Sequence, residues 1–408
     1  MTVRLVVVGV APLSAPVEAE SAAVGAALAA AGIAVDSRVL VEEDEAALER
    51  ALLSEGLTVV LAGPGGSSGD VVRRVVARVA GTRLVLNERM LAALEETHRR
   101  QDRPLPRRAE RLALLPQSAS VWSAADGDPA WVLDGPRAAF VVVPRGGGVP
   151  AAIAQQVVDL ARARTSGRGV TVVRTLRTTG ASLTDVEERV AEWLGKDGDV
   201  VVATLPTDGE VWVRLRARGA TVEDASDAIA AVEPRVAAAL GEDCYGRDAE
   251  SLEQVVGRLL IARRLTLSVA ESCTGGLLGH RLTAVSGSSA YFDRGVVVYS
   301  NRAKEEMLGV PAEVLRTRGA VSAECAEAMV RGICDRSGSA CGLSVTGIAG
   351  PEGGSPAKPV GTVFIGVGVP GEVASRRFRF DGDRASVKWQ SSQMALDMLR
   401  RRLGGTPS

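Results

Sequence analysis

Short aliphatic runs alternate with longer stretches of helical periodicity over the first 165 residues of the chain. The runs are rich in valine and leucine with few polar interruptions, which is the pattern of strands buried on both faces. The pattern predicts strands at residues 4–8, 35–41, 57–62 and 138–143, and helices at residues 18–31, 43–53, 71–80 and 87–99. Strands and helices in this alternation indicate an α/β fold with a mostly parallel sheet.

A different order of elements follows the stretch Thr-Ser-Gly-Arg-Gly-Val at residues 165–170, which we interpret as a linker. Strands are expected at residues 170–177, 200–205 and 210–218, and helices at residues 182–193 and 222–240. The turn between the second and third strands is Pro206-Thr207-Asp208-Gly209. The resulting β-α-β-β-α order is typical of a small α+β module.

Strand and helix alternation returns from about residue 248. The pattern predicts helices at residues 252–264, from 274 onward, at 324–336 and at 383–403, and strands at residues 265–270, 294–299, 342–346, 360–367 and 373–380. A loop rich in glycine and proline is expected at residues 347–359. The chain is therefore expected to have three domains, at residues 1–165, 166–247 and 248–408.

Composition excludes several classes of protein without assigning a function. The chain has 48 basic and 49 acidic residues, so its net charge of −1 gives no overall attraction to nucleic acid or to an anionic membrane. No apolar run is long enough to span a bilayer. The odd number of cysteines, without metal-ligand spacing, favours a reducing cytoplasmic setting and disfavours a zinc site. The two histidines, His98 and His280, are too few and too far apart for a histidine metal site.

Candidate chemistry begins at Ser272, where a predicted strand meets a predicted helix in the sequence Glu-Ser-Cys-Thr-Gly-Gly. The free N–H groups and positive dipole end of such a helix can stabilise developing negative charge. A serine hydroxyl also needs a base within hydrogen-bond reach. His280 is eight residues further on, about 12 Å along the helix, so a Ser-His-Asp arrangement is not expected.

Lys304 and Tyr299 are the remaining candidate bases. Lys304 would act as a base if burial lowers its pKa, and Tyr299 if a neighbouring ammonium stabilises its phenolate. A strand end and the helix start that follows it can both face one cleft at the carboxyl edge of a sheet. The same spacing also fits a helix-capping serine with a surface tyrosine and lysine, and it does not decide between the two interpretations.

The glycine-rich segment from Gly347 to Pro356 follows a predicted strand and offers a second feature. Glycines allow a ligand to approach the backbone closely, and successive N–H groups can form an anion-binding nest. An ordinary hairpin-like loop explains the segment equally well. Lys358 and Arg384 flank it, either as phosphate contacts or as solvated surface charges.

These motifs together make the chain resemble the CinA family of competence- or damage-inducible proteins. The resemblance is strongest over residues 269–366, in the sequences AESCTGG, GSSAYFDRG, VYSNRAK, GAVS, TGIAGPEGG and KPVGTV. It implies a C-terminal nicotinamide mononucleotide deamidase that forms nicotinate mononucleotide and ammonia for pyridine nucleotide salvage. It further implies Ser272 as nucleophile, Tyr299 and Lys304 as acid–base groups, and Thr346 as a ligand contact.

The remaining site assignments combine the resemblance with the glycine pattern. Oxyanion donors are expected at the N–H groups of residues 274–276, by inference from the helix start. The candidate substrate-binding residues are Thr274, Gly275, Gly276, Thr346, Gly347, Gly353, Gly354 and Arg384. No cofactor and no metal are expected.

The first 165 residues resemble the N-terminal, molybdopterin-binding-like domain of the family, and the sequence RTLRTTGASLTDVEERV resembles its connecting module. Family members usually carry Gly-Asp-Glu after the first strand, where this chain has Gly9-Val10-Ala11-Pro12. Only Asp70 remains of the acidic residues in the glycine-rich loop at residues 62–71. The resemblance implies a metal-dependent ADP-ribose pyrophosphatase activity for this domain, which needs carboxylates to hold a hard cation. One carboxylate is a poor site for such a cation, so we expect this activity to be weak and the domain to serve as a scaffold or binding domain.

The sequence thus predicts a nicotinamide mononucleotide amidohydrolase in the cytoplasm. Two alternatives stay open: a nucleotide pyrophosphatase carried by the N-terminal domain, and a non-enzymatic interaction protein connected with competence or DNA damage. The expected partner is a small nucleotide substrate rather than nucleic acid or membrane. The chain is expected to form a homo-oligomer, namely a dimer.

Overall fold

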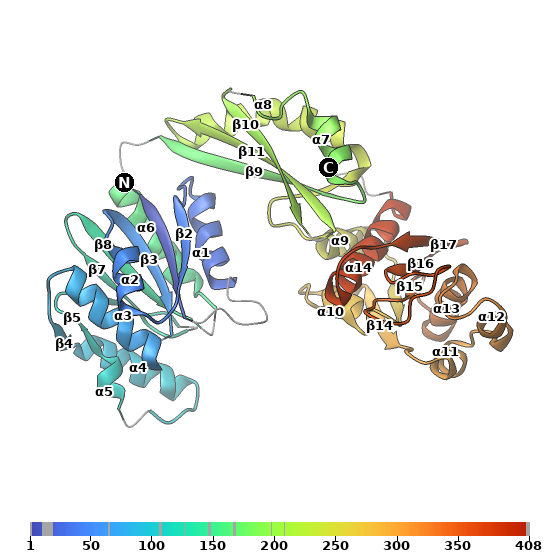
Figure 1. Ribbon diagram of the computed structural model, residues 1–408, viewed down its shortest axis with the longest axis horizontal. Coiled ribbons are helices and arrows are strands. Elements are labelled where there is room, and N and C mark those ends of the chain that lie inside the picture. Colours follow the sequence, from blue (N-terminus) through green and yellow to red (C-terminus); the bar gives the residue numbers. More distant parts are fainter. Residues whose placement is uncertain are drawn as a thin grey trace. The chain divides into compact units, whose positions relative to one another are not determined.

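A computed structural model describes residues 2–9, 19–63, 66–105, 108–125, 127–145, 148–165, 169–196, 198–207 and 209–404. The chain forms two compact units, one of Met1–Val173 with Ala217–Ala228 and one of Arg174–Arg216 with Ile229–Ser408 (Figure 1). Residues 166–168 of the expected linker and Asp208 of the expected turn lie outside the described residues. None of the described helices is long and apolar enough to cross a membrane.

The N-terminal unit is built on a six-stranded sheet in the order β2-β1-β3-β8-β7-β6. The four strands from β2 to β8 are parallel, and β7 and β6 continue the sheet antiparallel. All seven residues of β3 are buried, as its unbroken aliphatic sequence predicts. The strands are β1 (Val3–Val8), β2 (Ser37–Val41), β3 (Gly56–Ala62), β6 (Ser120–Trp122), β7 (Ala130–Asp134) and β8 (Ala138–Pro144).

Helices cover both faces of this sheet, which makes three layers. One core lies under α1 (Ala19–Ala30) and α6 (Ala151–Thr165). The other lies under α2 (Glu45–Leu52), α3 (Gly66–Val79) and α4 (Glu88–Arg100). The expected α/β architecture is confirmed. The aliphatic pattern did not predict α6, the strands β6 and β7, the short helix α5 (Ala109–Leu112), or the small pair β4 (Leu84–Leu86) and β5 (Leu114–Pro116).

A four-stranded sheet in the order β10-β11-β9-β12 forms the middle of the chain. It contains the expected β-α-β-β-α elements and one unexpected strand, β12, that pairs antiparallel with β9. The elements are β9 (Val170–Thr179), α7 (Leu183–Val190), β10 (Val200–Thr207), β11 (Glu210–Gly219), α8 (Val222–Leu240) and β12 (Cys244–Arg247).

The C-terminal part of the chain is a second three-layered α/β structure on the five-stranded sheet β14-β13-β15-β16-β17. The first three strands are parallel, and β16 and β17 are antiparallel to their neighbours. The strands are β13 (Leu267–Glu271), β14 (Phe292–Val297), β15 (Cys341–Gly347), β16 (Thr362–Val369) and β17 (Glu372–Arg379).

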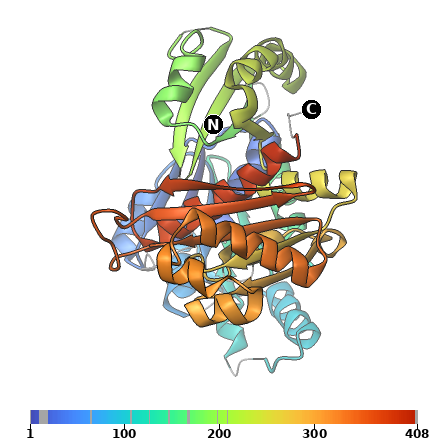
Figure 2. The same ribbon diagram turned by 90° about the vertical axis from the view of Figure 1, so that its right-hand side faces the viewer.

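Two separate apolar cores lie on the two faces of this sheet. On one face pack α9 (Leu252–Arg263), α10 (Leu277–Thr283) and α14 (Arg384–Arg402). On the other pack α11 (Asn301–Leu308), α12 (Ala312–Thr317) and α13 (Ala323–Ser337), and Figure 2 shows α13 crossing the red strands. The parallel strands β14, β13 and β15 all end at one edge, so the residues that follow them are brought together there.

Two element boundaries near this edge differ from the prediction. Helix α10 begins at Leu277 rather than Thr274, because Gly275 and Gly276 have φ angles of +62° and +94° that a right-handed helix cannot contain. Strand β14 ends at Val297, so Tyr299 lies in the loop between β14 and α11 rather than on the strand.

Candidate functional site

Ser272 and Lys304 are in direct contact at the carboxyl edge of the C-terminal sheet. The Lys304 Nζ atom lies 3.0 Å from the Ser272 Oγ atom. Ser272 directly follows β13, and its backbone N–H donates to the carbonyl of Val345 on β15 at 2.9 Å. Ser272 is 8% exposed and Lys304 is 1% exposed, so the contact is shielded from bulk water. A buried serine–amine pair of this kind fits nucleophilic catalysis without histidine.

The position of Lys304 is set by α11. Ser300 caps this helix by accepting the N–H of Ala303, and Lys304 follows within the first turn. Its ammonium also donates to the carbonyls of Val298 at 2.8 Å and Tyr299 at 3.4 Å. Burial lowers the pKa of Lys304, and no carboxylate among the described residues forms an ion pair with it to reverse that effect. A lowered pKa raises the fraction of neutral amine, which is the form that accepts a proton.

Glu271 occupies much of the helix start that was expected to bind an oxyanion. Its buried carboxylate accepts the N–H groups of Gly276 and Leu278 at 3.0 Å each and of Gly279 at 2.8 Å. The N–H of Gly275 donates to the Ser272 carbonyl at 3.1 Å. The expectation that residues 274–276 supply the oxyanion donors is therefore wrong for Gly275 and Gly276, because their N–H groups already have acceptors.

Two backbone donors of the same turn stay uncommitted. Within the described part of the chain, the N–H groups of Cys273 and Thr274 donate to no acceptor on another residue. They follow the Ser272 side chain directly, which is where an oxyanion formed by attack of that serine needs donors. Burial raises the pKa of the neighbouring Cys273 thiol to about 11, so this cysteine stays protonated at neutral pH and does not compete as a nucleophile.

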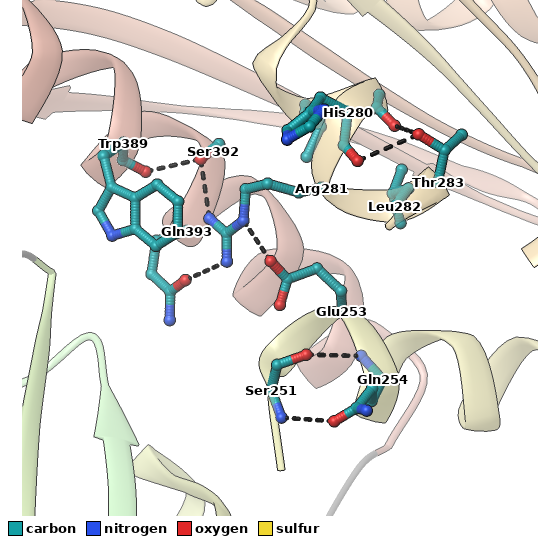
Figure 3. A network of polar contacts seen from close by, with 12 residues as sticks. Ser251, Glu253, Gln254, His280, Arg281, Leu282, Thr283, Trp389, Ser392 and Gln393 are labelled. Carbon is teal, nitrogen blue, oxygen red and sulfur yellow. Dashed lines mark hydrogen bonds and ion pairs between the residues drawn. The ribbon is translucent and has the colours of Figure 1, made fainter. Parts of the chain in front are cut away.

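Arg281 anchors the other side of α10 to α9 and α14 (Figure 3). Its guanidinium donates to Glu253, to Ser392 Oγ at 2.8 Å and to Gln393 Oε1 at 2.6 Å, and it lies 4.2 Å from the centre of the Trp389 ring. All four partners belong to α9 or α14, so the helix that follows the Ser272 turn is fixed at both ends. The amide nitrogen of Gln393 donates in turn to Glu210 on β11 at 2.8 Å.

Tyr299 lies at the rim of the site rather than beside the serine. Its side chain is 63% exposed, and its hydroxyl accepts a hydrogen bond from Arg384 Nη2 at 3.2 Å. Among the described contacts, that hydroxyl touches neither Ser272 nor Lys304. The structure thus brings Ser272 and Lys304 together as the sequence suggested, and links Tyr299 to them only through its backbone carbonyl.

Thr346 and Thr274 are both buried at this edge but differ in their partners. The Thr346 hydroxyl donates to the Ala320 carbonyl at 2.8 Å, which joins the end of β15 to the Gly-Ala-Val-Ser segment at residues 319–322. The Thr274 hydroxyl has no hydrogen-bond partner among the described residues. A buried hydroxyl without a partner is rare in folded proteins.

The glycines predicted to bind substrate fall into two groups. A side chain at Gly347 would meet the Thr362 carbonyl at 2.7 Å, and one at Gly354 would meet the Val360 nitrogen at 2.8 Å. Packing against backbone therefore explains those two glycines without a ligand. Gly275, Gly276 and Gly353 have positive φ angles, and nothing lies closer than 3.6 Å to the position of a side chain there.

Three cations lie near residues of this site, and one of them was not predicted. Arg384 begins α14 and donates to the Gly350 carbonyl at 2.8 Å, and Lys358 donates to the Arg318 carbonyl at 3.1 Å. Lys388, one turn after Arg384, places its Nζ atom 3.7 Å from the side-chain position of Gly275. Lys388 could have been found from the sequence, because it follows Arg384 by four residues on a predicted helix and residues at that spacing share one face.

The N-terminal unit has no comparable arrangement in its described residues. The Asp70 carboxylate forms ion pairs with Arg73 and Arg111, so it is neutralised by protein cations. Arg145 donates to the Val8 carbonyl at 2.9 Å and lies 3.8 Å from the Glu20 carboxylate. Val10 and Ala11 lie outside the described residues. Nowhere in the described ranges do three or more histidine, cysteine, aspartate or glutamate side chains group as metal ligands do.

Comparison with known proteins identifies the family. A model of the CinA C-terminal domain matches residues 249–403, and a model of the damage-inducible protein CinA KH domain matches residues 173–246. A CinA-like protein of Geobacter sulfurreducens is 39% identical over 397 residues, covering 95% of each chain. The chain belongs to the CinA family.

A second relative and one solved structure are also similar to this chain. A putative competence-damage inducible protein of Moorella thermoacetica is 39% identical over 396 residues, again covering 95% of each chain. The solved structure of a CinA superfamily protein from Klebsiella pneumoniae is 40% identical and covers 38% of this chain and 96% of its own, with a TM-score of 0.37. The names of the Moorella and Klebsiella proteins refer to competence and damage, and none of the three names states a reaction.

Proposed function

We propose that the C-terminal domain of this CinA-family chain, residues 248–408, is an amidohydrolase that converts nicotinamide mononucleotide to nicotinate mononucleotide and ammonia. The contact between the Ser272 hydroxyl and the buried Lys304 amine is the observation that carries the reaction class. The identity of the proposed substrate comes from the resemblance to the CinA deamidase domain. Hydrolysis of a carboxamide needs only water as a second reactant, so the proposal includes no cofactor.

The first half of the reaction is acyl transfer to Ser272. Neutral Lys304 accepts the hydroxyl proton while Ser272 Oγ bonds to the carboxamide carbon, and the amide π electrons move to oxygen. The N–H groups of Cys273 and Thr274 donate to the resulting oxyanion. The lysine ammonium then protonates the leaving nitrogen, the carbon–nitrogen bond breaks, and ammonia departs from an ester of Ser272.

The second half reverses the roles with water as nucleophile. Lys304 takes a proton from water as the water oxygen bonds to the ester carbon, and the oxyanion forms again at the same two N–H groups. Lys304 then returns a proton to Ser272 Oγ as the ester bond breaks, which releases the carboxylic acid, and the acid loses its proton to water to give the carboxylate product. Tyr299 is retained in the proposal as an acid–base group at the rim, where Arg384 holds its hydroxyl.

Substrate contacts are proposed around the same edge. Thr274 in the turn and Thr346 at the end of β15 are proposed to contact the substrate. Gly275, Gly276 and Gly353 leave the backbone open for a ligand. Arg384 supplies a cation beside Tyr299. Gly347 and Gly354 are proposed to let the loop pack closely against the neighbouring backbone, since packing already explains the absence of their side chains.

Incubation of the purified chain with nicotinamide mononucleotide tests the proposal. We expect release of ammonia and nicotinate mononucleotide in equal amounts, at the same rate with and without a chelator. Ser272→Ala provides the control for a contaminating amidase. A chain that is folded, carries no such activity, and shows none after addition of divalent metal would refute the proposed reaction.

A further inference from the structure

Lys388 is a cation without a partner next to the turn that carries Ser272. Its side chain is half-buried on α14, and its Nζ atom lies 3.7 Å from the side-chain position of Gly275. Gly275 is three residues after Ser272, and three residues span at most about 11 Å between Cα atoms. Lys388 and Ser272 therefore lie within the size of one mononucleotide.

The other cations around this turn already have acceptors. Lys304 contacts Ser272 and two carbonyls, Arg384 contacts Gly350 and Tyr299, and Lys358 contacts the Arg318 carbonyl. Lys388 makes no hydrogen bond or ion pair with any residue in the described part of the chain.

Open backbone faces this ammonium. Gly275 has a φ of +62°, and the Lys388 Nζ atom is the one heavy atom recorded within 4 Å of its side-chain position. A group of the size of a phosphate can approach both the glycine and the ammonium there, because no Cβ atom stands between them. A lysine ammonium is a compact point charge with three donors, which suits a phosphate dianion.

We propose that Lys388 binds the phosphate group of the mononucleotide substrate and makes the site specific for nucleotides over nucleosides. The inference rests on the proposed deamidase function, because it assigns the end of the substrate opposite to the carboxamide that Ser272 attacks. Arg384, one turn earlier on the same face of α14, holds Tyr299 and Gly350 and so fixes the rim beside the phosphate.

Comparison of a substrate with and without its phosphate tests this assignment. The wild type, Lys388→Met and the matched control Lys196→Met are assayed with nicotinamide mononucleotide and with nicotinamide riboside. For K388M we expect a loss of about 10- to 100-fold in kcat/KM on the mononucleotide, the effect of removing a hydrogen bond to a charged group. The riboside has no phosphate, so its kcat/KM stays within about threefold, and K196M changes neither value.

Binding measurements separate this proposal from the proposed reaction. In a Ser272→Ala background, calorimetric titration measures the affinity for both compounds without turnover. K388M is expected to weaken mononucleotide binding by about 10- to 100-fold and to leave riboside binding unchanged, while Lys388→Arg retains part of the affinity. If the wild type binds mononucleotide but releases no ammonia, the reaction is wrong and the phosphate assignment still stands or falls on these affinities.

Equal losses on both compounds would show that Lys388 supports the fold or the reacting end, and would overturn the assignment. Unchanged affinity and kcat/KM for the mononucleotide would overturn it as well. The variant Lys358→Met supplies the competing outcome. If K358M alone shows the phosphate-dependent loss, the phosphate lies beside Lys358 and Lys388 does not bind it.

Discussion

The Lys304 amine reaches Ser272 across a sheet edge, at 3.0 Å, although the two residues are 32 positions apart in the chain. Ser272 comes from the end of β13 and Lys304 from the first turn of α11, which follows the neighbouring strand β14. Parallel pairing of β13 and β14 puts both strand ends at one edge, and helix capping by Ser300 turns Lys304 back toward the serine. The chemistry of the site depends on this pairing.

Ser272→Ala should abolish ammonia release while the fold is retained. The change removes one hydroxyl, and the Lys304 ammonium keeps the Val298 carbonyl as an acceptor at 2.8 Å. Loss of a nucleophile normally lowers kcat by several orders of magnitude. His280→Ala is the matched control, because His280 is exposed on α10, and it should leave kcat unchanged. Turnover by S272A within about tenfold of wild type would exclude a covalent serine intermediate.

The rate should rise with pH through the ionisation of Lys304. The neutral amine is the base, so kcat/KM increases as pH passes upward through the pKa of Lys304. Burial lowers that pKa from 10.5, which moves the rising limb to lower pH than a solvated lysine would give. A pH–rate profile on the wild type checks this. Lys304→Met should remove at least about a hundredfold of activity, and a profile unchanged in Lys304→Arg would contradict the assignment.

The same shift predicts how stability depends on pH. The folded state releases the Lys304 proton more readily than the unfolded state, so unfolding takes up a proton between the lowered pKa and 10.5. Wild-type stability therefore rises with pH through that window relative to Lys304→Met, and the difference is constant below and above it. Urea unfolding of both proteins across the window measures this, and a wild type that loses stability relative to K304M as pH rises would be inconsistent with burial.

Glu271→Gln should lower kcat more than it raises KM. The carboxylate accepts three N–H groups at 2.8 and 3.0 Å, and an amide offers one oxygen and a nitrogen that donates instead. We expect about a tenfold loss or more in kcat through displacement of the Ser272 turn, with Glu271→Asp recovering part of it. Steady-state kinetics separate kcat from KM. A purely structural role would lower the melting temperature while leaving kcat of the folded fraction unchanged.

A fragment of residues 248–408 should retain deamidase activity. It contains Ser272, Lys304 and every partner of Arg281, namely Glu253, Ser392, Gln393 and the Trp389 ring. Gln393 loses its bond to Glu210 but keeps its bond to Arg281. The measurement is ammonia release by the purified fragment, with its folding checked by thermal melting. A folded fragment without activity would show that the connecting module completes the site.

Hydrolysis of ADP-ribose by the full chain should be weak with any divalent metal. A cation clamped to a diphosphate needs several oxygen ligands, and Asp70 is already paired with Arg73 and Arg111. Glu20 faces Arg145 in the same unit. Chromatographic detection of AMP and ribose 5-phosphate, with magnesium and with manganese, tests the expectation. A substantial metal-dependent rate that Asp70→Ala removes would show that Asp70 leaves its arginines and binds the metal.

The α/β architecture was predictable because buried parallel strands have few polar residues. The strands β1, β3 and β8 are almost wholly buried, so nearly all of their residues are apolar and the strands can be recognised from the sequence. The strands β4, β5 and β6 have three residues each, which is too short for any periodicity to appear. Their positions depend on pairing: β4 pairs with β5, and β6 pairs with the next strand, β7.

The sequence by itself supplied the candidates for the site. Ser272, Lys304 and the glycines around them stand in motifs that resemble the CinA family, and the position of His280, eight residues after Ser272, argued against a histidine base. Their relations were decided only by tertiary structure: Lys304 against Ser272, Glu271 on the amides of α10, Tyr299 turned to Arg384, and Lys388 beside Gly275. The physical reason is that hydrogen bonds and burial act over a few ångströms in space, and the fold sets those distances by pairing segments that the sequence keeps far apart.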